Sequence, residues 1–298
     1  MAELRFCLYQ YQHRPLPELR LRWLRAEALG FDVLWNVDTV VEPDTPGAMM
    51  FDGPSTLVQM ALATSKVRVG TLVSSMYFRS PVTLAKATMT VDHLSDGRVE
   101  LALGVGDPSA GAAAAGVNWT VREQVARFSE FVELTDMLLR QDRTSYEGRY
   151  YRCRDAESVP RSLQAPRPPL TIAAHGPRML AITSRYADSW SSWGGYGLTS
   201  EAEMFRLTRD RSLRLTDLCA ELGRDPATLR RSIVCFPPMR PWASTEAFTD
   251  MVGRYRSIGI DEFVLYWPRT WDSRASQEDT VFEHVMSDVA PGLKAGPR

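Results

Sequence analysis

The sequence predicts an α/β fold, a single (β/α)8 barrel, on three observations. Short β-branched apolar segments typical of strands alternate along the chain with segments that have the apolar spacing of helices. The strand segments are almost continuously apolar, as expected for parallel strands covered on both faces. No linker rich in proline, glycine and serine divides the chain. Its 298 residues, 44% of them hydrophobic, suffice for one large domain, which we place at residues 1–298.

The first half of the chain supplies four strands and four helices. Pro15 and Pro17 favour the start of the first helix, and Gly30 favours its end. Proline, aspartate and glycine mark residues 39–53 as a loop, and we also expect a loop at Gly104–Asn118. The predicted strands are Leu4–Gln10, Phe31–Val37, Val67–Val73 and Val99–Leu103, and the predicted helices are Leu19–Leu29, Ser55–Thr64, Pro81–His93 and Thr120–Arg140.

The second half begins with an insertion at about residues 142–169, made of a short hairpin at Ser145–Cys153 and a proline-rich segment at Arg154–Pro169. Four strand–helix pairs follow. The predicted strands are Leu170–Ala174, Ala187–Trp193, Ser232–Phe236 and Glu262–Tyr266, and the predicted helices are Pro177–Tyr186, Glu201–Leu222, Thr245–Ile258 and Gln277–Val289. Eight alternating pairs are typical of a (β/α)8 barrel, in which the loops after the strands build the active face.

Composition excludes several classes of function. The formal charge is −1 and arginines are dispersed among acids, so neither nucleic acid nor an anionic membrane is an expected partner. The chain has neither a membrane-spanning apolar run nor a leader-like start. Its cysteines, Cys7, Cys153, Cys219 and Cys235, form no CxxC pair, which indicates thiols in the cytoplasm. Four scattered histidines and no HExxH motif make a metal site unexpected, and GxSxG and P-loop motifs are also absent.

Two glycine motifs follow predicted strands. Gly104-Val105-Gly106 stands at a strand's carboxyl end, where glycine lets the backbone approach a planar ring closely. It is not a dinucleotide fingerprint, because Ser109 occupies the third glycine position. His175-Gly176-Pro177-Arg178 opens a helix whose first backbone N–H groups would face an anion. The alternative to this anion site is an ordinary helix start with a surface histidine.

Four segments together resemble the luciferase-like monooxygenase family, whose members bind the deazaflavin coenzyme F420 or FMN in a barrel. They are Ala26–Asp38, Arg79–Arg98, Tyr146–Tyr151 and Ile172–Trp190. Within the second segment, Ser95-Asp96-Gly97-Arg98 reads as a scaffold turn between a helix and a strand rather than as a ligand contact. An acidic residue at Asp107 resembles the F420 users, so F420 is the expected cofactor and FMN the alternative.

The resemblance also implies which residues line the cofactor. It implies a cis peptide at Thr71–Leu72, in a bulge that would press on the ring, and places the cofactor phosphate at the turn before Pro177. The implied cofactor-binding residues are Asn36, Thr71, Leu72, Ser74, Gly104, Gly106, Asp107, Ala174, His175, Gly176 and Arg178.

The expected catalytic residues are His13 and Asp38. F420-dependent dehydrogenases of the family commonly carry Asp-His after the second strand, whereas this chain has Asp38-Thr39. His13, with an ordinary pKa near neutrality, is then the best acid–base candidate, and a solvated loop histidine is the alternative. Asp38 could instead be a buried, paired carboxylate. The expected substrate pocket is formed by Met76, Tyr77, Trp190 and Trp193, with core packing as the alternative.

These observations favour an oxidoreductase that transfers a hydride between F420 and an organic small molecule, as a reductase rather than an alcohol dehydrogenase. A reduced-FMN-dependent monooxygenase and a non-catalytic flavin-binding protein on the same fold are the alternatives. The resemblance also implies a homodimer. Apolar residues of the first helix, Leu21, Trp23, Leu24 and Leu29, exceed what one buried helix face needs.

Overall fold

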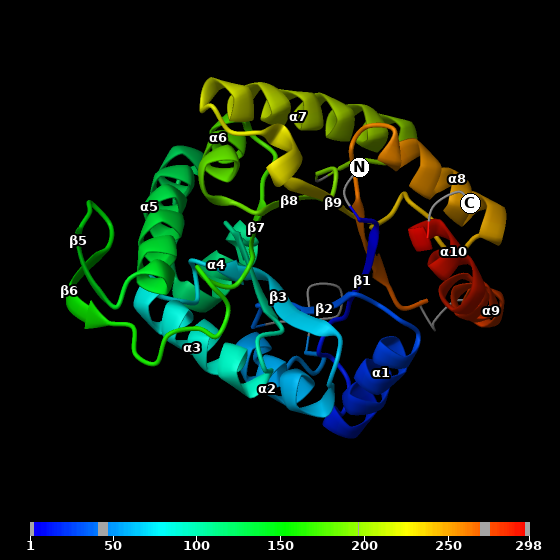
Figure 1. Ribbon diagram of the computed structural model, residues 1–298, viewed down its shortest axis with the longest axis horizontal. Helices are drawn as coiled ribbons and strands as arrows, with labels where there is room; N and C mark the ends of the chain where they lie inside the picture. Colours follow the sequence, from blue (N-terminus) through cyan, green and yellow to red (C-terminus); the bar gives the residue numbers. More distant parts are fainter. Residues whose placement is uncertain (1–2, 41–46, 196, 269–274, 296–298) are drawn as a thin grey trace. The chain divides into compact units, whose positions relative to one another are not determined.

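Eight strands pair into a closed barrel in the order β1-β10-β9-β8-β7-β4-β3-β2 in the computed structural model (Figure 1). The structure describes residues 3–40, 47–195, 197–268 and 275–295. The barrel strands are β1 (Arg5–Tyr9), β2 (Val33–Asn36), β3 (Arg68–Ser75), β4 (Val99–Gly104), β7 (Leu170–Ala173), β8 (Ser189–Ser192), β9 (Arg230–Val234) and β10 (Glu262–Tyr266). The predicted (β/α)8 fold is confirmed, with strand bounds shifted by up to a few residues.

Helices alternate with these strands. They are α1 (Leu16–Ala28), α2 (Gly53–Ala63), α3 (Pro81–Leu94), α4 (Pro108–Ala115), α5 (Val121–Arg140), α6 (Pro177–Tyr186), α7 (Glu201–Glu221), α8 (Thr245–Arg256), α9 (Ala275–His284) and α10 (Ala290–Ala295). A 3-10 turn lies at Pro226–Thr228 and a π-helical turn at Val285–Val289. The insertion carries a two-stranded sheet, β5 (Arg143–Glu147) and β6 (Arg152–Glu157), as predicted.

One predicted loop was wrong in part, because Gly104–Asn118 contains helix α4. Asp107 is its N-cap, accepting a hydrogen bond from the Ser109 N–H at 2.8 Å, and Pro108 occupies its first turn. Gly116 ends it in the left-handed conformation, at φ 64°. An alanine- and glycine-rich helix has no apolar periodicity, so the sequence pattern could not reveal it.

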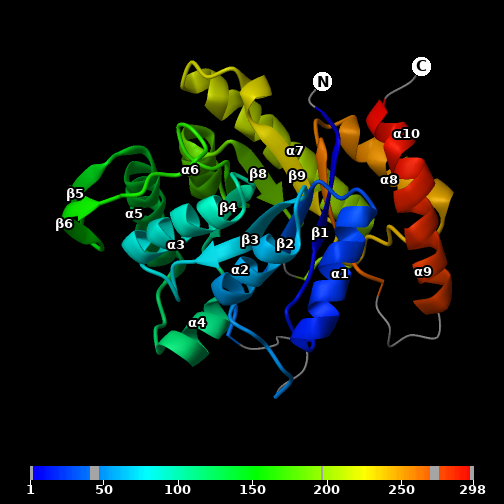
Figure 2. The same ribbon diagram turned by 60° about the horizontal axis from the view of Figure 1, so that its bottom comes forward.

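Internal contacts group the chain into two compact units. The 35–173 unit comprises residues 11–23 and 35–173, and the 174–298 unit comprises residues 1–10, 24–34 and 174–298. We describe each unit by itself, and the single domain at residues 1–298 stays a prediction. In the 35–173 unit, α2 packs on β3, and α3 packs on β4 and α5 (Figure 2).

The turn after α3 has the scaffold role expected of it. The Arg98 guanidinium donates hydrogen bonds to the carbonyl oxygens of Ala61, Thr64 and Val67 at 2.7–3.0 Å, which satisfies the carboxyl end of α2. The Arg98 N–H donates to Ser95 Oγ at 3.2 Å. Asp92 Oδ1 accepts from Gln164 Nε2 at 2.7 Å and thereby fastens the insertion to α3. These residues hold elements together, in agreement with the scaffold interpretation.

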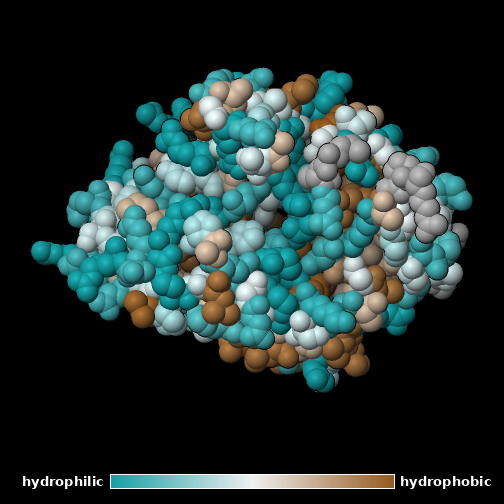
Figure 3. Space-filling model, viewed as in Figure 1, coloured by the Kyte–Doolittle hydropathy of each residue, from teal (hydrophilic) through white to brown (hydrophobic). Residues whose placement is uncertain are grey.

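An apolar surface lies over α1 and α2. Leu21 of α1 is 66% exposed and Leu62 of α2 is 63% exposed. Figure 3 shows apolar surface at the lower edge of the molecule, where Figure 1 places α2 and α1. Trp23, counted above among the surplus apolar residues, is buried in the core, so this part of the expectation was wrong. Leu24 and Leu29 are partly exposed, which leaves a narrower apolar face than the sequence indicated.

Candidate active site

A bulge distorts strand β3 at its carboxyl half. The pairing of β3 with β4 shifts register between Thr71 and Ser74, and the Leu72–Val73 peptide is cis. The predicted cis bond at Thr71–Leu72 was therefore wrong by one position. A Cβ on Gly104 would lie 2.6 Å from Val73 Cγ2, so glycine is needed there for close approach of β4 to the bulge.

Asp38 is a buried, paired carboxylate, with its side chain 1% exposed. Arg79 Nη2 donates to Asp38 Oδ1 at 2.8 Å, and Arg79 Nε donates to Oδ2 at 3.2 Å. The Ser75 N–H donates to Oδ2 at 3.3 Å. Both carboxylate oxygens are thus occupied, and the hydrogen bonds that Arg79 donates to Asp38 raise the pKa of Arg79 against the opposing effect of burial. The structure shows the paired alternative for Asp38, and a catalytic role stays a prediction.

Arg79 also binds Asp52, the N-cap of α2. Arg79 Nη2 lies 2.5 Å from Asp52 Oδ1, and the Ser55 N–H donates to Asp52 Oδ2 at 2.9 Å. Burial alone would raise the pKa of Asp52, but the hydrogen bonds from Ser55 and Arg79 lower it. One guanidinium therefore links the end of β2, the start of α2 and the segment between β3 and α3.

Gln12 fixes the backbone beside Asp38. Its side chain is buried, and its Nε2 donates to the Val37 carbonyl at 2.5 Å while its Oε1 accepts from the Val37 N–H at 3.3 Å. A Cβ on Gly53 would lie 2.5 Å from the same carbonyl, so α2 begins in contact with this backbone. Together these contacts fix the end of β2.

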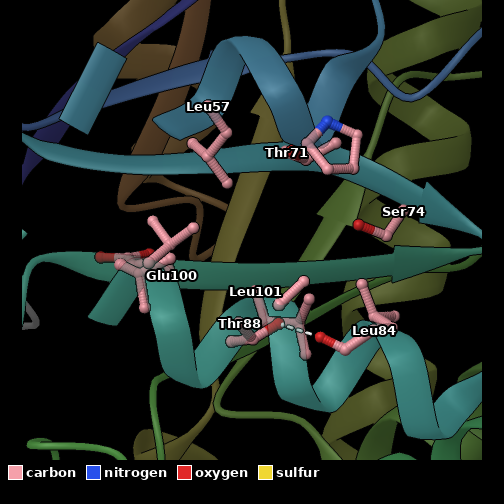
Figure 4. A pocket seen from close by; sticks show the side chains of 11 residues that line it. Leu57, Thr71, Ser74, Leu84, Thr88, Glu100 and Leu101 are labelled. Atoms are coloured by element: carbon pink, nitrogen blue, oxygen red, sulfur yellow. Dashed lines mark hydrogen bonds between the residues drawn. The ribbon is translucent and has the colours of Figure 1, made fainter. Parts of the chain in front are cut away.

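Asn36, Thr71 and Ser74 face the helices. Asn36 Nδ2 donates to the Gly53 carbonyl at 2.7 Å, and Thr71 Oγ1 donates to Asn36 Oδ1 at 2.7 Å. Thr71 and Ser74 line a cavity of about 20 Å³ that is also lined by Thr88 of α3 (Figure 4). Such a cavity holds about one water molecule. These placements favour structural roles for the three residues, whose cofactor contact stays a prediction.

Helix α4 covers the aromatic residue that follows β3. Tyr77 is 8% exposed and stacks on Trp119, with ring centroids 5.0 Å apart, while Met76 is 5% exposed. A Cβ on Gly111 of α4 would lie 2.5 Å from the Tyr77 ring. Burial raises the pKa of Tyr77, with a further contribution from Asp107. The substrate-pocket role of Met76 and Tyr77 stays a prediction.

His13 and Gly106 are two further predicted site residues in the 35–173 unit. His13 is partly exposed, and its ring lies beside that of Tyr11 with centroids 5.9 Å apart. Gly106 has φ 83°, and a Cβ there would collide with the Ser75 side chain. Ser75 Oγ donates to the Val105 carbonyl at 3.0 Å, so the glycine turn packs on the bulged strand.

In the 174–298 unit, helix α6 begins without a side-chain cap. Its N-cap is Gly176, which makes no side-chain hydrogen bond, and Pro177 follows in the first turn. Gly176 and Arg178 are exposed, and a Cβ on Gly176 would meet no atom within 4 Å. Among the described residues, no side chain caps the first N–H groups of α6, an arrangement that suits an anion.

His175 is held neutral beside this turn. Its Nε2 accepts from the Trp193 N–H at 3.4 Å, and burial, followed by the charge of Arg211, lowers the pKa of His175 to about 4. Trp193 also contacts Phe236, with ring centroids 6.4 Å apart. The substrate-pocket role of Trp193 stays a prediction.

Trp190 belongs to the core rather than to a pocket. It is fully buried, and its Nε1 donates to the Ala174 carbonyl at 2.8 Å. The Ala174 N–H in turn donates to the Ser191 carbonyl at 3.2 Å. Core packing, the alternative given for Trp190, is what the structure shows.

A family model described as luciferase-like monooxygenase matches residues 5–238, which is more than half of the chain. The chain belongs to the luciferase-like monooxygenase family. The family and the closed barrel of this luciferase-like protein agree with the sequence resemblance.

Relatives of this luciferase-like protein include F420-dependent enzymes. The F420-dependent hydroxymycolic acid dehydrogenase of Mycobacterium tuberculosis is 27% identical over 91% of this chain and 71% of its own length. The F420-dependent glucose-6-phosphate dehydrogenase of Intrasporangium calvum is 30% identical over 91% of this chain and 93% of its own length. A solved F420-dependent secondary alcohol dehydrogenase in complex with an F420-acetone adduct shares the fold, with a TM-score of 0.80 at 16% identity, over 95% of this chain and 98% of that one.

In the 174–298 unit, the uncapped start of α6 offers N–H groups that suit an anion such as a phosphate. In the 35–173 unit, Gly104 and Gly106 pack against the side chains of Val73 and Ser75. Within residues 3–40, 47–195, 197–268 and 275–295, no three His, Cys, Asp or Glu side chains gather as metal ligands. In the same described residues, no helix has the length and apolarity that a membrane span requires.

Three contributors escaped sequence reasoning: Gln12, Arg79 and Arg211. Arg79 lies inside the best-matched segment, but its partners Asp38 and Asp52 are 41 and 27 residues away. No local pattern encodes such pairing. Arg211 stands on a charged helix, where one arginine looks like the others.

Proposed function

We propose that this protein is an F420-dependent oxidoreductase that reduces an organic small molecule. The observation that carries the proposal is the 30% identity to an F420-dependent dehydrogenase over 93% of that relative's length. When bound, F420 supplies hydride chemistry that no protein side chain provides. The residues of the protein then bind, exclude water and move one proton.

Within each unit, taken by itself, a short set of residues is proposed to contact the coenzyme. In the 35–173 unit, the residues that the resemblance implies for the ring are the bulge at Leu72 and the turn Gly104–Asp107, whose glycines pack against Val73 and Ser75 of the bulged strand. In the 174–298 unit, Ala174–Gly176 and the first turn of α6 would bind phosphate through backbone N–H groups. Arg178, exposed on that turn, would add a positive charge at its edge.

The state of Asp38 supports reduction over alcohol oxidation. Oxidising an alcohol needs a base for its hydroxyl proton, yet both Asp38 oxygens already accept hydrogen bonds from Arg79 and Ser75. The following residue is Thr39 instead of a histidine. Reduction needs a proton donor, and His13, partly exposed after β1, is the proposed one.

The proposal is tested by turnover under argon. Purified protein is mixed with reduced F420 and a panel of aldehydes and ketones, and the return of oxidised deazaflavin absorbance is followed. We expect at least one carbonyl compound to oxidise the coenzyme faster than protein-free buffer does. Oxygen consumption with reduced FMN, and none of the F420 reaction, would instead indicate the monooxygenase. Binding of F420 without turnover of any compound would indicate a non-catalytic binding protein.

The protein is further proposed to be a cytoplasmic homodimer. Leu21 and Leu62, exposed on α1 and α2, supply an apolar face of the kind that interfaces cover. The cysteines are thiols, as expected in a reducing compartment.

A further inference from the structure

A row of rings follows the carboxyl ends of neighbouring barrel strands, in residues of the 174–298 unit. Tyr9, at the end of β1, has Tyr266 of β10 as its register partner. The Tyr9 ring meets that of Phe236, after β9, edge-on at 86° with centroids 5.5 Å apart. Phe236 meets Trp193, after β8, at 6.4 Å, and Trp193 meets His175, after β7, at 5.5 Å. We call these five residues the aromatic row, and the strands that they end or follow are consecutive in the barrel.

The aromatic row begins on the face of the strands that points away from the helices. Phe6 of β1 contacts Phe248 of α8 with ring centroids 5.5 Å apart, and its register partner Phe263 lies 6.0 Å from it. Side chains alternate along a strand, so a residue three positions on points to the opposite face. Tyr9 and Tyr266 stand three positions after Phe6 and Phe263. They therefore face the inside of the barrel at the carboxyl ends of the strands, where (β/α)8 enzymes bind their substrates.

The aromatic row is less completely packed than the core beside it. Four of its five members are partly exposed, and Tyr9 is 8% exposed. The phenylalanines on the helix-facing side of the same strands, Phe6 and Phe263, are 0% exposed. Large rings left partly open at the active end of the strands, next to a fully packed core, are typical of a surface that a ligand covers.

The aromatic row presents no formal charge near neutral pH. Burial, and then the charge of Arg211, lowers the pKa of His175 to about 4, so its imidazole is neutral. Arg211 itself donates to the Gly194 carbonyl at 2.5 Å and fastens α7 to the loop after β8. The Tyr266 hydroxyl donates to the Met239 carbonyl at 3.4 Å. Such a surface suits an uncharged, apolar group better than a sugar or a phosphate.

We propose that the aromatic row binds the substrate of this protein and selects a ketone or aldehyde that carries an aromatic ring. Edge-on pairs such as Tyr9–Phe236 and Phe236–Trp193 leave ring faces for a further ring, a contact that stabilises beyond the burial of apolar area. On reduction, the carbonyl carbon gains a hydride from reduced F420 and the oxygen gains a proton, so an alcohol forms and the coenzyme is oxidised. This reaction rests on the proposed function, whereas binding of the ring can be measured without it.

The test compares the full-length wild type with Phe236→Leu, Trp193→Leu and Phe205→Leu. Leucine keeps an apolar side chain and removes the ring. Phe205 is the matched control, because it is partly exposed and meets Tyr255 edge-on at 5.3 Å, but stands on helix α7 instead of at a strand end. The probes are acetophenone, its saturated analogue cyclohexyl methyl ketone, and the charged ketone dihydroxyacetone phosphate. Ligand-observed NMR gives each Kd with and without oxidised F420, and assays with reduced F420 give each KM.

Wild type should bind acetophenone at least about threefold more tightly than the saturated ketone, and should bind the phosphorylated ketone most weakly. Phe236→Leu and Trp193→Leu should each weaken acetophenone binding by about three- to tenfold, because one ring contact is lost. Binding of the saturated ketone should change by less than about twofold, because the apolar area is largely kept. Phe205→Leu should match wild type, and the KM for acetophenone should follow the Kd across the variants.

Binding and turnover distinguish a failure of this inference from a failure of the proposed function. If binding depends on the ring and on Phe236 and Trp193, but no ketone oxidises reduced F420, the aromatic row is a binding surface and the proposed reduction fails. If ketones oxidise reduced F420 but acetophenone has no advantage over its saturated analogue, the reduction holds and the inference is overturned. Tighter binding of the phosphorylated ketone, unchanged acetophenone affinity in both variants, or no acetophenone binding by wild type also overturns it.

Discussion

At the scale of single residues, the arginines of this protein differ in the groups to which they donate hydrogen bonds. Arg79 joins two carboxylates, Arg98 binds carbonyl oxygens at the end of α2, and Arg211 binds the Gly194 carbonyl. The first two stabilise local structure. The third fastens α7 to the loop after β8. The same residue type therefore joins different kinds of element, and its surroundings decide which.

The Asp38–Arg79 pair gives a quantitative prediction. Arg79→Met leaves a buried carboxylate without its partner and should lower the free energy of unfolding by about 3–5 kcal/mol. Asp38→Asn added to that variant should restore part of the loss, because the orphaned charge is then removed. Urea denaturation of both single variants and the double variant measures the coupling. Strict additivity of the two substitutions would show that the pair does not act as a unit.

His175 gives a prediction about pH. The pKa of this histidine falls from 6.5 to about 4 in the folded protein, so the unfolded chain binds more protons between these values. Its contribution to stability is present above pH 6.5 and is lost as the pH falls towards 4. We expect His175→Gln to lose less stability than wild type over this range in thermal unfolding scans. Parallel pH curves for the two proteins would contradict the assignment.

At the scale of elements, the turn into α6 should bind a ligand without supporting the fold. Gly176→Val places branches where a Cβ has open space, at an ordinary φ of −81°, so the fold should tolerate it. The branches would crowd the N–H groups proposed to bind phosphate. F420 affinity should then fall at least about tenfold, because one charged hydrogen bond is lost. Gly292→Val, at another open glycine, is the control. Equal F420 affinity in both variants, by fluorescence titration, would place the phosphate elsewhere.

At the scale of the whole molecule, strands were predictable and long-range pairings were not. The eight barrel strands appear in the sequence as short apolar runs, because parallel strands are covered on both faces. Helix α4 escaped notice because alanine and glycine leave no apolar stripe. The family segments predicted the glycine turn at Gly176, but the hydrogen bonds of Asn36 and Trp190 join partners that no sequence spacing encodes.

Assembly is also a property of the whole molecule. Leu21→Glu combined with Leu62→Glu would place charges on the exposed face of α1 and α2, and we expect it to convert a homodimer into monomers. Leu213→Glu on α7, at a leucine 59% exposed, should leave the mass unchanged. Light scattering at micromolar concentration measures both. A monomeric wild type, or a dimer that survives the double substitution, would contradict this interface.

The central claim is that this protein binds F420 in preference to FMN. The most direct measurement is a parallel titration of the purified protein with F420 and with FMN, followed by the spectral change of each and by protein fluorescence. We expect saturable F420 binding that is at least about tenfold tighter than FMN binding. We also expect F420 binding to be weaker in Gly176→Val, by about the contribution of one charged hydrogen bond. Micromolar affinity for FMN with no detectable F420 binding would contradict it.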